Sequence, residues 1–301
     1  RYDTLSNGYP SWVNVQSGYA YGEAMYTYEV QTIIDSSSII DGVTAFRVIA
    51  AMEEGNFASE TMYGYSVDNI HPETPSNFLF SHAGNNVTYE WEYSIEEDFN
   101  YHFINGLWDT ELTVENFHIY EMDYRHDEHW IQSVDIHDNM SENSRSIMSI
   151  KLHEGANLIS YNVLPEDVSV ENVLSSLENN VNTVIGEGLS SMLVNGNWIG
   201  SLLEIVPENG YWVKINNDDI LLINGYPTER YNEYTLHIGH NLISYPYRYP
   251  MPIADALPEE IECTTSYIIH GIQGEGISAI CTESGWLGSL TNLEGSYGYW
   301  F

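Results

Sequence analysis

The side chains best suited to chemistry in this chain are four in a row, His126-Asp127-Glu128-His129, which supply two imidazoles and two carboxylates. Both groups are metal ligands, provided that they converge on one point. Histidines three residues apart on a strand point to opposite faces, so these two cannot converge. We therefore expect no metal site here and predict that residues 126–129 form a polar hairpin loop.

Catalytic signatures are missing elsewhere in the sequence. Two Gly-Glu-Gly segments, at 186–188 and 274–276, lack the lysine of a phosphate-binding loop. No Gly-x-Ser-x-Gly elbow occurs, and the carboxylates form no recognisable glycosidase pair. Trp198 and Trp286 could stack on a sugar ring, although a Trp beside Gly in a β-rich module is more typical of a core or turn residue. The sequence thus predicts no enzyme, no catalytic residue and no cofactor.

Two kinds of covalent modification can be expected. Cys263 and Cys281 are the only cysteines, too few for a structural zinc site, and we predict a disulfide between them that closes a loop of about 18 residues. Asn86 and Asn139 each begin an Asn-x-Ser/Thr sequon and are candidate glycosylation sites.

The charge of the chain restricts its partners. Forty-four acidic residues face eight basic ones, which gives a formal net charge of −36. Nucleic acid and anionic membrane surfaces are poor partners, because binding would bring like charges together. No apolar run reaches the length of a membrane span. The acidity leaves calcium open, but no EF-hand spacing is present and we assign no ligands.

Composition also indicates a compartment. The sequence begins at Arg1 without an initiator Met, and it contains 24 Tyr and 8 Trp but only two lysines. These features are typical of a processed, exported β-protein. We expect the protein to be secreted, either extracellular or at the cell surface.

The last half of the chain contains a duplicated module. Four short blocks recur in one order, the first 84 residues later and the others 88 residues later. The repeated positions are Gly, Trp and apolar residues rather than catalytic groups, which indicates a role in architecture. The blocks are 155–161 and 239–245, 186–190 and 274–278, 198–202 and 286–290, and 210–212 and 298–300.

Each module is expected to be β-rich with one short helix. In the first copy the helix follows Pro165, is capped by Asp167 or Ser169, and carries an apolar stripe from Val170 to Leu177. The repeat resembles one found in secreted surface proteins of Bacteroidetes-like bacteria that use a type IX-like secretion route. That resemblance implies export and a surface role, and no activity.

Residues 69–150 resemble a fibronectin type III or Ig-like domain. The resemblance rests on the Pro-rich entry at 72–78, on Trp91, and on the aromatic strand 129–135 with its following Asn-x-Ser turn. It implies a β-sandwich fold and no specific ligand.

The first 68 residues resemble only part of another such domain. Strands are predicted around residues 11–17, 25–33, 43–51 and 60–67, whereas a complete sandwich needs seven. Either another chain completes the sandwich, or upstream residues have been lost.

The sequence therefore predicts a mainly β fold with tandem Ig/fibronectin III-like sandwiches followed by two β-rich modules. The predicted domains are an incomplete sandwich with an N-terminal arm (1–68), a sandwich (69–150), and two repeat modules (151–227 and 228–301).

The combination also resembles protomers of donor-strand-exchange fibrils from uncultured environmental bacteria. It implies a homopolymeric extracellular filament, in which Tyr2, Leu5 and Tyr9 of the N-terminal arm fill the incomplete sandwich of another subunit. Two alternatives stay open, namely a secreted adhesin or carbohydrate-binding surface protein with glycan partners, and an accessory fragment of a larger surface enzyme.

Overall fold

A computed structural model describes residues 1–301 except 5–7, 38–39, 230–232, 259–260, 262 and 264–267. The fold is mainly β, with two short α-helices and one 3₁₀ helix in the described part. The chain divides into two compact units. Unit 1 comprises 1–73, 95–100 and 133–142, and unit 2 comprises 74–94, 101–132 and 143–301. No helix among the described residues is long and apolar enough to cross a membrane.

Seven strands after residue 78 form a β-sandwich. One sheet has the order β11-β8-β7, and the other contains the order β10-β9-β12-β13. Three strands facing four in this order match an Ig or fibronectin III-like domain, as the sequence predicts. The strands are β7 (Leu79–Ala83), β8 (Asn86–Glu90), β9 (Phe99–Gly106), β10 (Thr110–Thr113), β11 (Phe117–Glu121), β12 (His126–Asp135) and β13 (Ser146–Leu152).

Large apolar side chains fill the space between the two sheets. Trp91 comes one residue after β8, is buried, and packs with Tyr89 from β8 and Ile131 from β12. The alternation of buried and exposed residues along β8 follows from the two-residue period of a strand whose one face meets the core. A turn at Gly84, which has φ 60°, joins β7 to β8 and sets this register.

The first module is joined to the sandwich through a shared sheet. Strand β20 pairs with β13 along seven residues and extends that sheet to six strands. A second, five-stranded sheet has the order β14-β19-β16-β17-β18. Ser169 caps helix α1 by accepting a hydrogen bond from the Asn172 amide, as one of the two predicted caps. The elements are β14 (Gly155–Ile159), β15 (Val163–Leu164), α1 (Val170–Val173), η1 (Ser175–Asn180), β16 (Val181–Ile185), β17 (Ser190–Val194), β18 (Asn197–Gly200), β19 (Tyr211–Ile215) and β20 (Asp219–Pro227).

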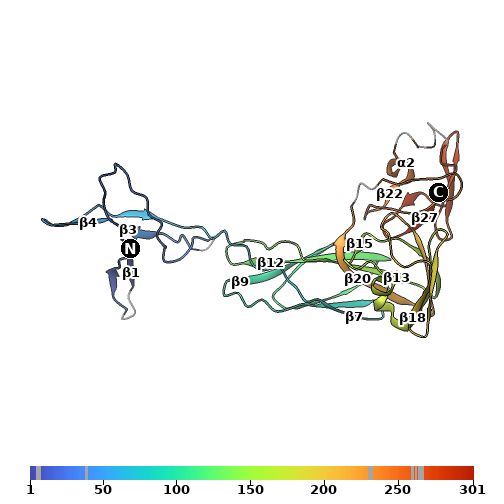
Figure 1. The fold of residues 1–301 in the computed structure, drawn as a ribbon, viewed down its shortest axis with the longest axis horizontal. Helices are drawn as coiled ribbons and strands as arrows, with labels where there is room; N and C mark the ends of the chain where they lie inside the picture. Colours follow the sequence, from blue (N-terminus) through green and yellow to red (C-terminus); the bar gives the residue numbers. More distant parts are fainter. Residues whose placement is uncertain (5–7, 38–39, 230–232, 259–260, 262, 264–267) are drawn as a thin grey trace. The chain divides into compact units, whose positions relative to one another are not determined.

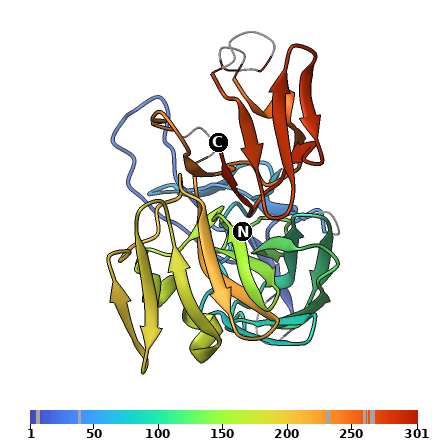
Figure 2. The same ribbon diagram turned by 90° about the vertical axis from the view of Figure 1, so that its right-hand side faces the viewer.

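The second module repeats this topology. Its five-stranded sheet has the order β21-β27-β23-β24-β25, which matches the first sheet strand for strand. Figure 2 draws the strands of the second module in red. The prediction of two copies of one module, each with a short helix, is confirmed. The elements are β21 (Leu242–Ser244), β22 (Met251–Pro252), α2 (Ile253–Ala256), β23 (Gly271–Gln273), β24 (Ser278–Thr282), β25 (Gly285–Gly288), β26 (Asn292–Leu293) and β27 (Gly298–Trp300).

The Gly-Glu-Gly turns have the same geometry in both copies. A Cβ on Gly186 would lie 3.3 Å from the ring of Tyr211, and one on Gly274 would lie 3.2 Å from the ring of Tyr299. The last glycine of each turn has φ +71°, which side chains disfavour. The positive φ therefore favours glycine at the end of each turn, and the close ring leaves little room for a side chain at its start, while the central glutamate is free to serve another purpose.

The beginning of the chain consists of separate two-stranded pairs (Figure 1). The pairs are β1-β2, β3-β6 and β4-β5. Residues 25–33 form no strand, so that prediction is wrong; alternation alone makes no strand when no neighbouring strand supplies hydrogen bonds. The strands are β1 (Tyr2–Thr4), β2 (Pro10–Trp12), β3 (Thr44–Phe46), β4 (Ile49–Met52), β5 (Gly55–Ala58) and β6 (Met62–Gly64).

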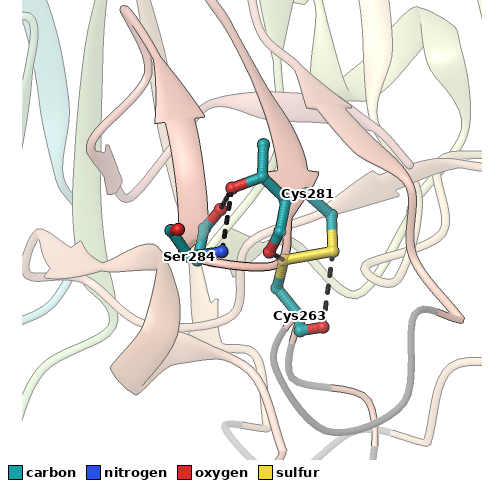
Figure 3. The surroundings of a disulfide bond; sticks show 5 residues. Cys263, Cys281 and Ser284 are labelled. Carbon is teal, nitrogen blue, oxygen red and sulfur yellow. Dashed lines mark hydrogen bonds between the residues drawn. A yellow bond between two sulfur atoms is a disulfide. The ribbon is translucent and has the colours of Figure 1, made fainter.

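Cys263 and Cys281 are joined by a disulfide, with Cα atoms 5.4 Å apart (Figure 3). Cys281 lies on β24, and the bond ties a connection of the second module to this strand. The first module has Leu193 at the position that corresponds to Cys281, so this covalent link distinguishes the two copies.

Replacing both cysteines by serine should destabilise the second module by about 3 kcal/mol, because the unfolded chain regains the freedom that an 18-residue link removes. Denaturant unfolding of the oxidised protein, the reduced protein and the double variant measures this. Reduced protein should match the variant. Equal stability of all three, or two free thiols in the mass of the unreduced protein, would contradict the prediction.

Candidate functional site

The N-terminal segment, residues 1–73, has strands but no apolar core. In its described part, none of the Val, Ile, Leu, Met, Phe, Tyr or Trp side chains is buried. Several are almost fully exposed, such as Tyr19 at 88%, Met25 at 81% and Val48 at 73%. Each strand pair also has two outer edges that pair with no other described strand. Unpaired edges beside exposed apolar side chains are a template for another strand.

The predicted donor arm is folded back on itself. Tyr2 lies opposite Trp12 in the β1-β2 hairpin, and their ring centroids are 5.3 Å apart. The guanidinium of Arg47 lies 4.1 Å above the Trp12 ring. Tyr9 is 72% exposed, and Leu5 lies outside the described residues. The arm is thus paired within its own chain and would have to open before it could pair elsewhere.

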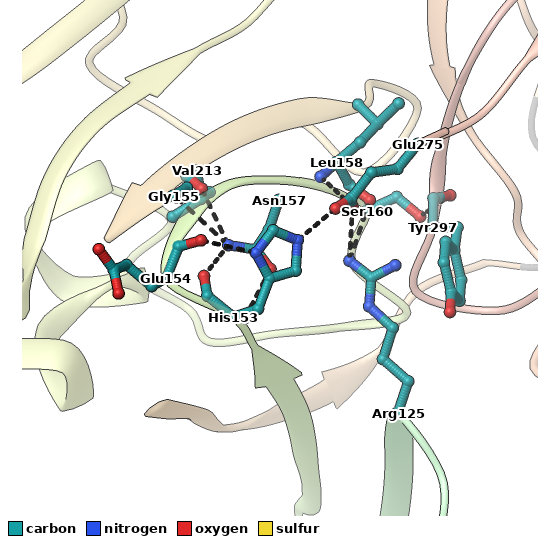
Figure 4. A network of polar contacts seen from close by, with 10 residues as sticks. All are labelled: Arg125, His153, Glu154, Gly155, Asn157, Leu158, Ser160, Val213, Glu275 and Tyr297. Atoms are coloured by element: carbon teal, nitrogen blue, oxygen red, sulfur yellow. Dashed lines mark hydrogen bonds and ion pairs between the residues drawn. The ribbon is translucent and has the colours of Figure 1, made fainter. Parts of the chain in front are cut away.

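The second candidate surface joins the two modules, and its first half is drawn in Figure 4. The carboxylate of Glu275, from the second module's Gly-Glu-Gly turn, accepts a hydrogen bond from the buried Leu158 amide at 2.9 Å and contacts His153 Nε2. Arg125 adds an ion pair to Glu275 at 3.2 Å and lies 3.9 Å from the Tyr297 ring centroid. The turn of one module is therefore held by the strand of the other.

The second half of this contact reverses the roles. Glu187, from the first module's Gly-Glu-Gly turn, accepts a hydrogen bond from the Leu242 amide at 2.8 Å and contacts His237 Nε2. We call the two halves together the reciprocal clasp. His153 and His237 correspond across the repeat, as do Glu187 and Glu275, so the clasp has approximate two-fold symmetry.

Asparagines hold the clasp histidines in place. Asn157 bonds the amide and carbonyl of His153 at 2.9 and 2.8 Å, and Asn241 bonds those of His237 at 2.8 and 3.0 Å. These asparagines begin the repeated Asn-Leu-Ile-Ser blocks. Sequence analysis identified the blocks but missed the histidines, which lie just before them. Their recurrence at the same 84-residue spacing was the available signal.

The clasp shifts the pKa values of its members. The side-chain bond to Glu275 raises the pKa of His153, while the Ile238 carbonyl and then Glu187 raise that of His237. Burial acts to raise the pKa of Glu275, but His153, the Leu158 amide and Arg125 outweigh it, so the pKa is lowered. The clasp is therefore most complete with charged histidines and ionised glutamates.

Residues 126–129 form part of β12 and are buried, so the prediction of a polar hairpin loop is wrong. The strand lies between β9 and β13, which hides its polar side chains and leaves other elements to satisfy them. His129 Nδ1 lies 2.9 Å from the Tyr89 hydroxyl, whereas His126 Nε2 lies 3.1 Å from the Arg248 carbonyl. The two imidazoles therefore have separate hydrogen-bond partners.

Burial shifts the pKa values of three side chains on this strand. It lowers the pKa of His126 to about 4 and that of His129 to about 3, and it raises the pKa of Asp127 to about 7. Glu128 instead forms a buried ion pair with Arg248 Nε at 2.6 Å. Both histidines are neutral at physiological pH, and the strand's polar groups serve to attach the sandwich to the second module.

A different set of residues converges as metal ligands do. Asp68, Asp98, Asp135 and His137, all in unit 1, bring one ligand atom each within 4.8 Å of one another. Sequence analysis left calcium open without naming ligands, and it could not find this set because three separate segments supply it.

The remaining candidates differ in accessibility. Asn86 is exposed at the start of β8. Asn139 uses its Nδ2, the atom that a glycan would take, to bond Asp135 Oδ2 at 2.8 Å. Trp198 and Trp286 pack against the cores of their own modules rather than standing out as a platform.

Comparisons with solved structures find distant likenesses. No protein-family model matches the chain, and no curated protein matches it. One similar solved structure is described as the central fibronectin-III array of RIM-binding protein, with 11% identity over 75% of this chain and 86% of that chain, and a TM-score of 0.22. The fold assignment rests on the strand order of the sandwich itself.

Removing Glu275 should weaken the clasp more than removing His153. The change Glu275→Ala leaves the buried Leu158 amide unpaired and should cost about 1–3 kcal/mol, whereas His153→Ala removes an exposed pair and should cost about 0.5 kcal/mol. Denaturant unfolding of both variants and their double variant gives the coupling energy. Glu283→Gln, an exposed carboxylate of the same module, is the control. Additive costs would contradict a direct contact.

The clasp should also make stability depend on pH. Because the histidine pKa values are raised, their contribution is complete below the unfolded value near 6.5 and is lost as pH rises through the folded value. The lowered glutamate pKa values contribute above about 4.5 and lose that contribution as pH falls through the folded values.

Melting temperature between about pH 6 and pH 8 measures this effect. The wild type should lose more stability over that range than the double variant His153→Gln/His237→Gln. Parallel pH profiles would show that the two histidines do not titrate with the fold.

Proposed function

We propose that the protein is a structural subunit of an extracellular filament. An extended strand from another copy completes the N-terminal segment. The observation that carries this proposal is the absence of any buried large apolar side chain in the described part of residues 1–73. Isolated two-stranded pairs are marginally stable in water, so such a segment gains most from an added strand.

The rest of the chain supports a structural role. Three buried apolar clusters fill the sandwich and the two modules, and the β13-β20 pairing and the reciprocal clasp join these parts. Head-to-tail donation is a heterologous contact that need not close, and repetition of it builds a filament. The net charge of −36 keeps neighbouring filaments apart.

The β1-β2 hairpin is the candidate donor. Opening it releases Tyr2 and Tyr9, and it costs one short strand pair, the Tyr2-Trp12 contact and the hydrogen bonds of Arg1 to the carbonyls of residues 13, 31 and 32. The freed arm then exchanges a marginal intramolecular pair for edges in another copy.

Deletion of residues 1–10 should prevent filament formation while leaving a folded monomer, because unit 2 does not include the arm. Electron microscopy of purified protein measures filament length, and circular dichroism checks folding. The double variant Tyr2→Ser/Tyr9→Ser should shorten filaments, and Thr4→Ser serves as the control. Filaments of normal length from the deleted chain would rule out donation by this arm.

Carbohydrate binding is the second candidate function, and one cavity favours it. The cavity has a volume of about 880 Å³, within the range of ligand sites, and lies against η1. Its lining combines the amides of Asn179 and Asn216, the carboxylate of Glu178 and the ring of Phe80. Amides, carboxylates and an aromatic ring are groups that can bind hydroxyls and the apolar face of a sugar.

A glycan array separates this function from the first. Binding that is lost in Glu178→Gln/Asn179→Ala, but kept in Asn197→Ala outside the cavity, would support a carbohydrate site. Wild-type protein that binds no glycan would leave assembly as the function of the chain.

A further inference from the structure

Three carboxylates and one imidazole meet in unit 1. Asp68 follows the N-terminal strand pairs, Asp98 precedes β9, and Asp135 and His137 lie at the end of β12. Their ligand atoms all lie within 4.8 Å of one another. Residues from three separate segments therefore converge on one point.

Three of these four side chains are buried or nearly so. Asp135 is fully buried, while the Asp68 and His137 side chains are only 10% and 11% exposed. Like charges at this separation repel one another more strongly where water is excluded. No lysine or arginine contacts the four residues in the described chain, so His137 is their one potential positive charge.

One nitrogen of the His137 imidazole lacks a hydrogen-bond partner. Its Nδ1 is buried and makes no hydrogen bond, although it lies 3.1 Å from Asp68 Oδ2. The nitrogen and the carboxylate oxygen are thus close enough for an ion pair, but their relative orientation does not allow a hydrogen bond. A buried nitrogen that faces a carboxylate in this way has a lone pair or a proton without a proper partner.

The separations between these ligand atoms fit the coordination of one cation. Metal–ligand bonds of about 2.1–2.4 Å place adjacent ligands about 3.0–3.4 Å apart and opposite ligands about 4.2–4.8 Å apart. The 3.1 Å separation falls in the first range, and 4.8 Å is the upper limit of the second.

Backbone contacts hold the ligands in place. Asp135 Oδ1 accepts hydrogen bonds from the His137 and Asn139 amides at 2.7 and 2.9 Å. The Ile136 amide donates to the Asp98 carbonyl at 2.9 Å, and Asn139 Nδ2 donates to the Asp68 carbonyl at 3.3 Å. The carboxylate of Asp98 has no hydrogen bond or ion pair within the described chain, which leaves it available as a ligand.

We propose that Asp68, Asp98, Asp135 and His137 bind one divalent cation. Carboxylate oxygens favour Ca²⁺ and Mn²⁺, and the imidazole nitrogen favours Mn²⁺ over Ca²⁺. The cation neutralises the carboxylates and fastens the end of the N-terminal segment to the segments around residues 98 and 135. The proposal is independent of filament assembly.

Calorimetric titration of the chelator-treated full chain with Mn²⁺ or Ca²⁺, in about 0.1 M salt to screen diffuse binding, tests the site. We expect one site of the highest affinity, weakened at least tenfold in Asp98→Asn and in Asp68→Asn. Glu97→Gln is the control. It removes one negative charge from the exposed side chain next to Asp98, and this variant should bind the cation as the wild type does. His137→Gln should weaken Mn²⁺ more than Ca²⁺.

Thermal unfolding gives a second readout, because the difference in melting temperature between the wild type and Asp98→Asn should change sign when the cation is added. In chelator, Asp98→Asn removes a repelling charge and should melt at or above the wild-type temperature. With saturating cation the wild type should melt higher than the variant. The proposal is overturned if Asp98→Asn and Asp68→Asn bind as tightly as the wild type, or if their melting order is the same with and without cation.

Discussion

The arrangement of the two modules depends on a carboxylate that reaches from a turn of one copy to a backbone amide of the other. Glu275 bonds the Leu158 amide, and Glu187 bonds the Leu242 amide. Each copy thus supplies one glutamate and one backbone amide to the reciprocal clasp. A change in either motif of one copy would remove a partner from the other, which is why turn and strand recur together. Gly210 and Gly298 also approach each other closely, since a Cβ on either would lie 3.1 Å from the Cα of the other.

Positive charge is scarce in this chain, and several of its basic groups lie where parts meet. Arg125 and Arg248 both connect the sandwich to the second module, through Glu275 and the buried Glu128. Lys151 on β13 donates to the Met122 carbonyl. With 44 acidic residues and eight basic ones, a buried carboxylate has few possible counter-ions. The Arg248–Glu128 pair is therefore specific, because removing the arginine takes the ion pair away from a buried carboxylate.

The two units differ in how much apolar surface they bury. Unit 2 buries apolar side chains in three clusters, whereas the described N-terminal segment buries none of its large ones. Its strand pairs, its exposed aromatic residues and the carboxylate set that includes Asp68 all leave interactions to be completed. The partner strand and the cation that we propose would complete different parts of the segment. Assembly and cation binding can therefore be separated experimentally.

Local pattern determined much of the fold. The duplicated blocks showed two copies of one module, since Gly and Trp positions recur only where backbone geometry and packing recur. Ser169 was one of two predicted caps, and Trp91 was placed correctly in a sandwich core. These features depend on residues close in sequence or on a two-residue period, which a single chain displays directly.

Only the tertiary structure decided the partners of the polar side chains. Residues 126–129 look like a loop because they are charged, yet β9 and β13 flank them and Arg248 lies 120 residues further along the chain from Glu128. The partners of Glu187 and Glu275, and the convergence of Asp68, Asp98 and Asp135, likewise depend on segments distant in sequence. Composition gives the number of such charges, but Coulomb and hydrogen-bond energies depend on distances that exist only after folding.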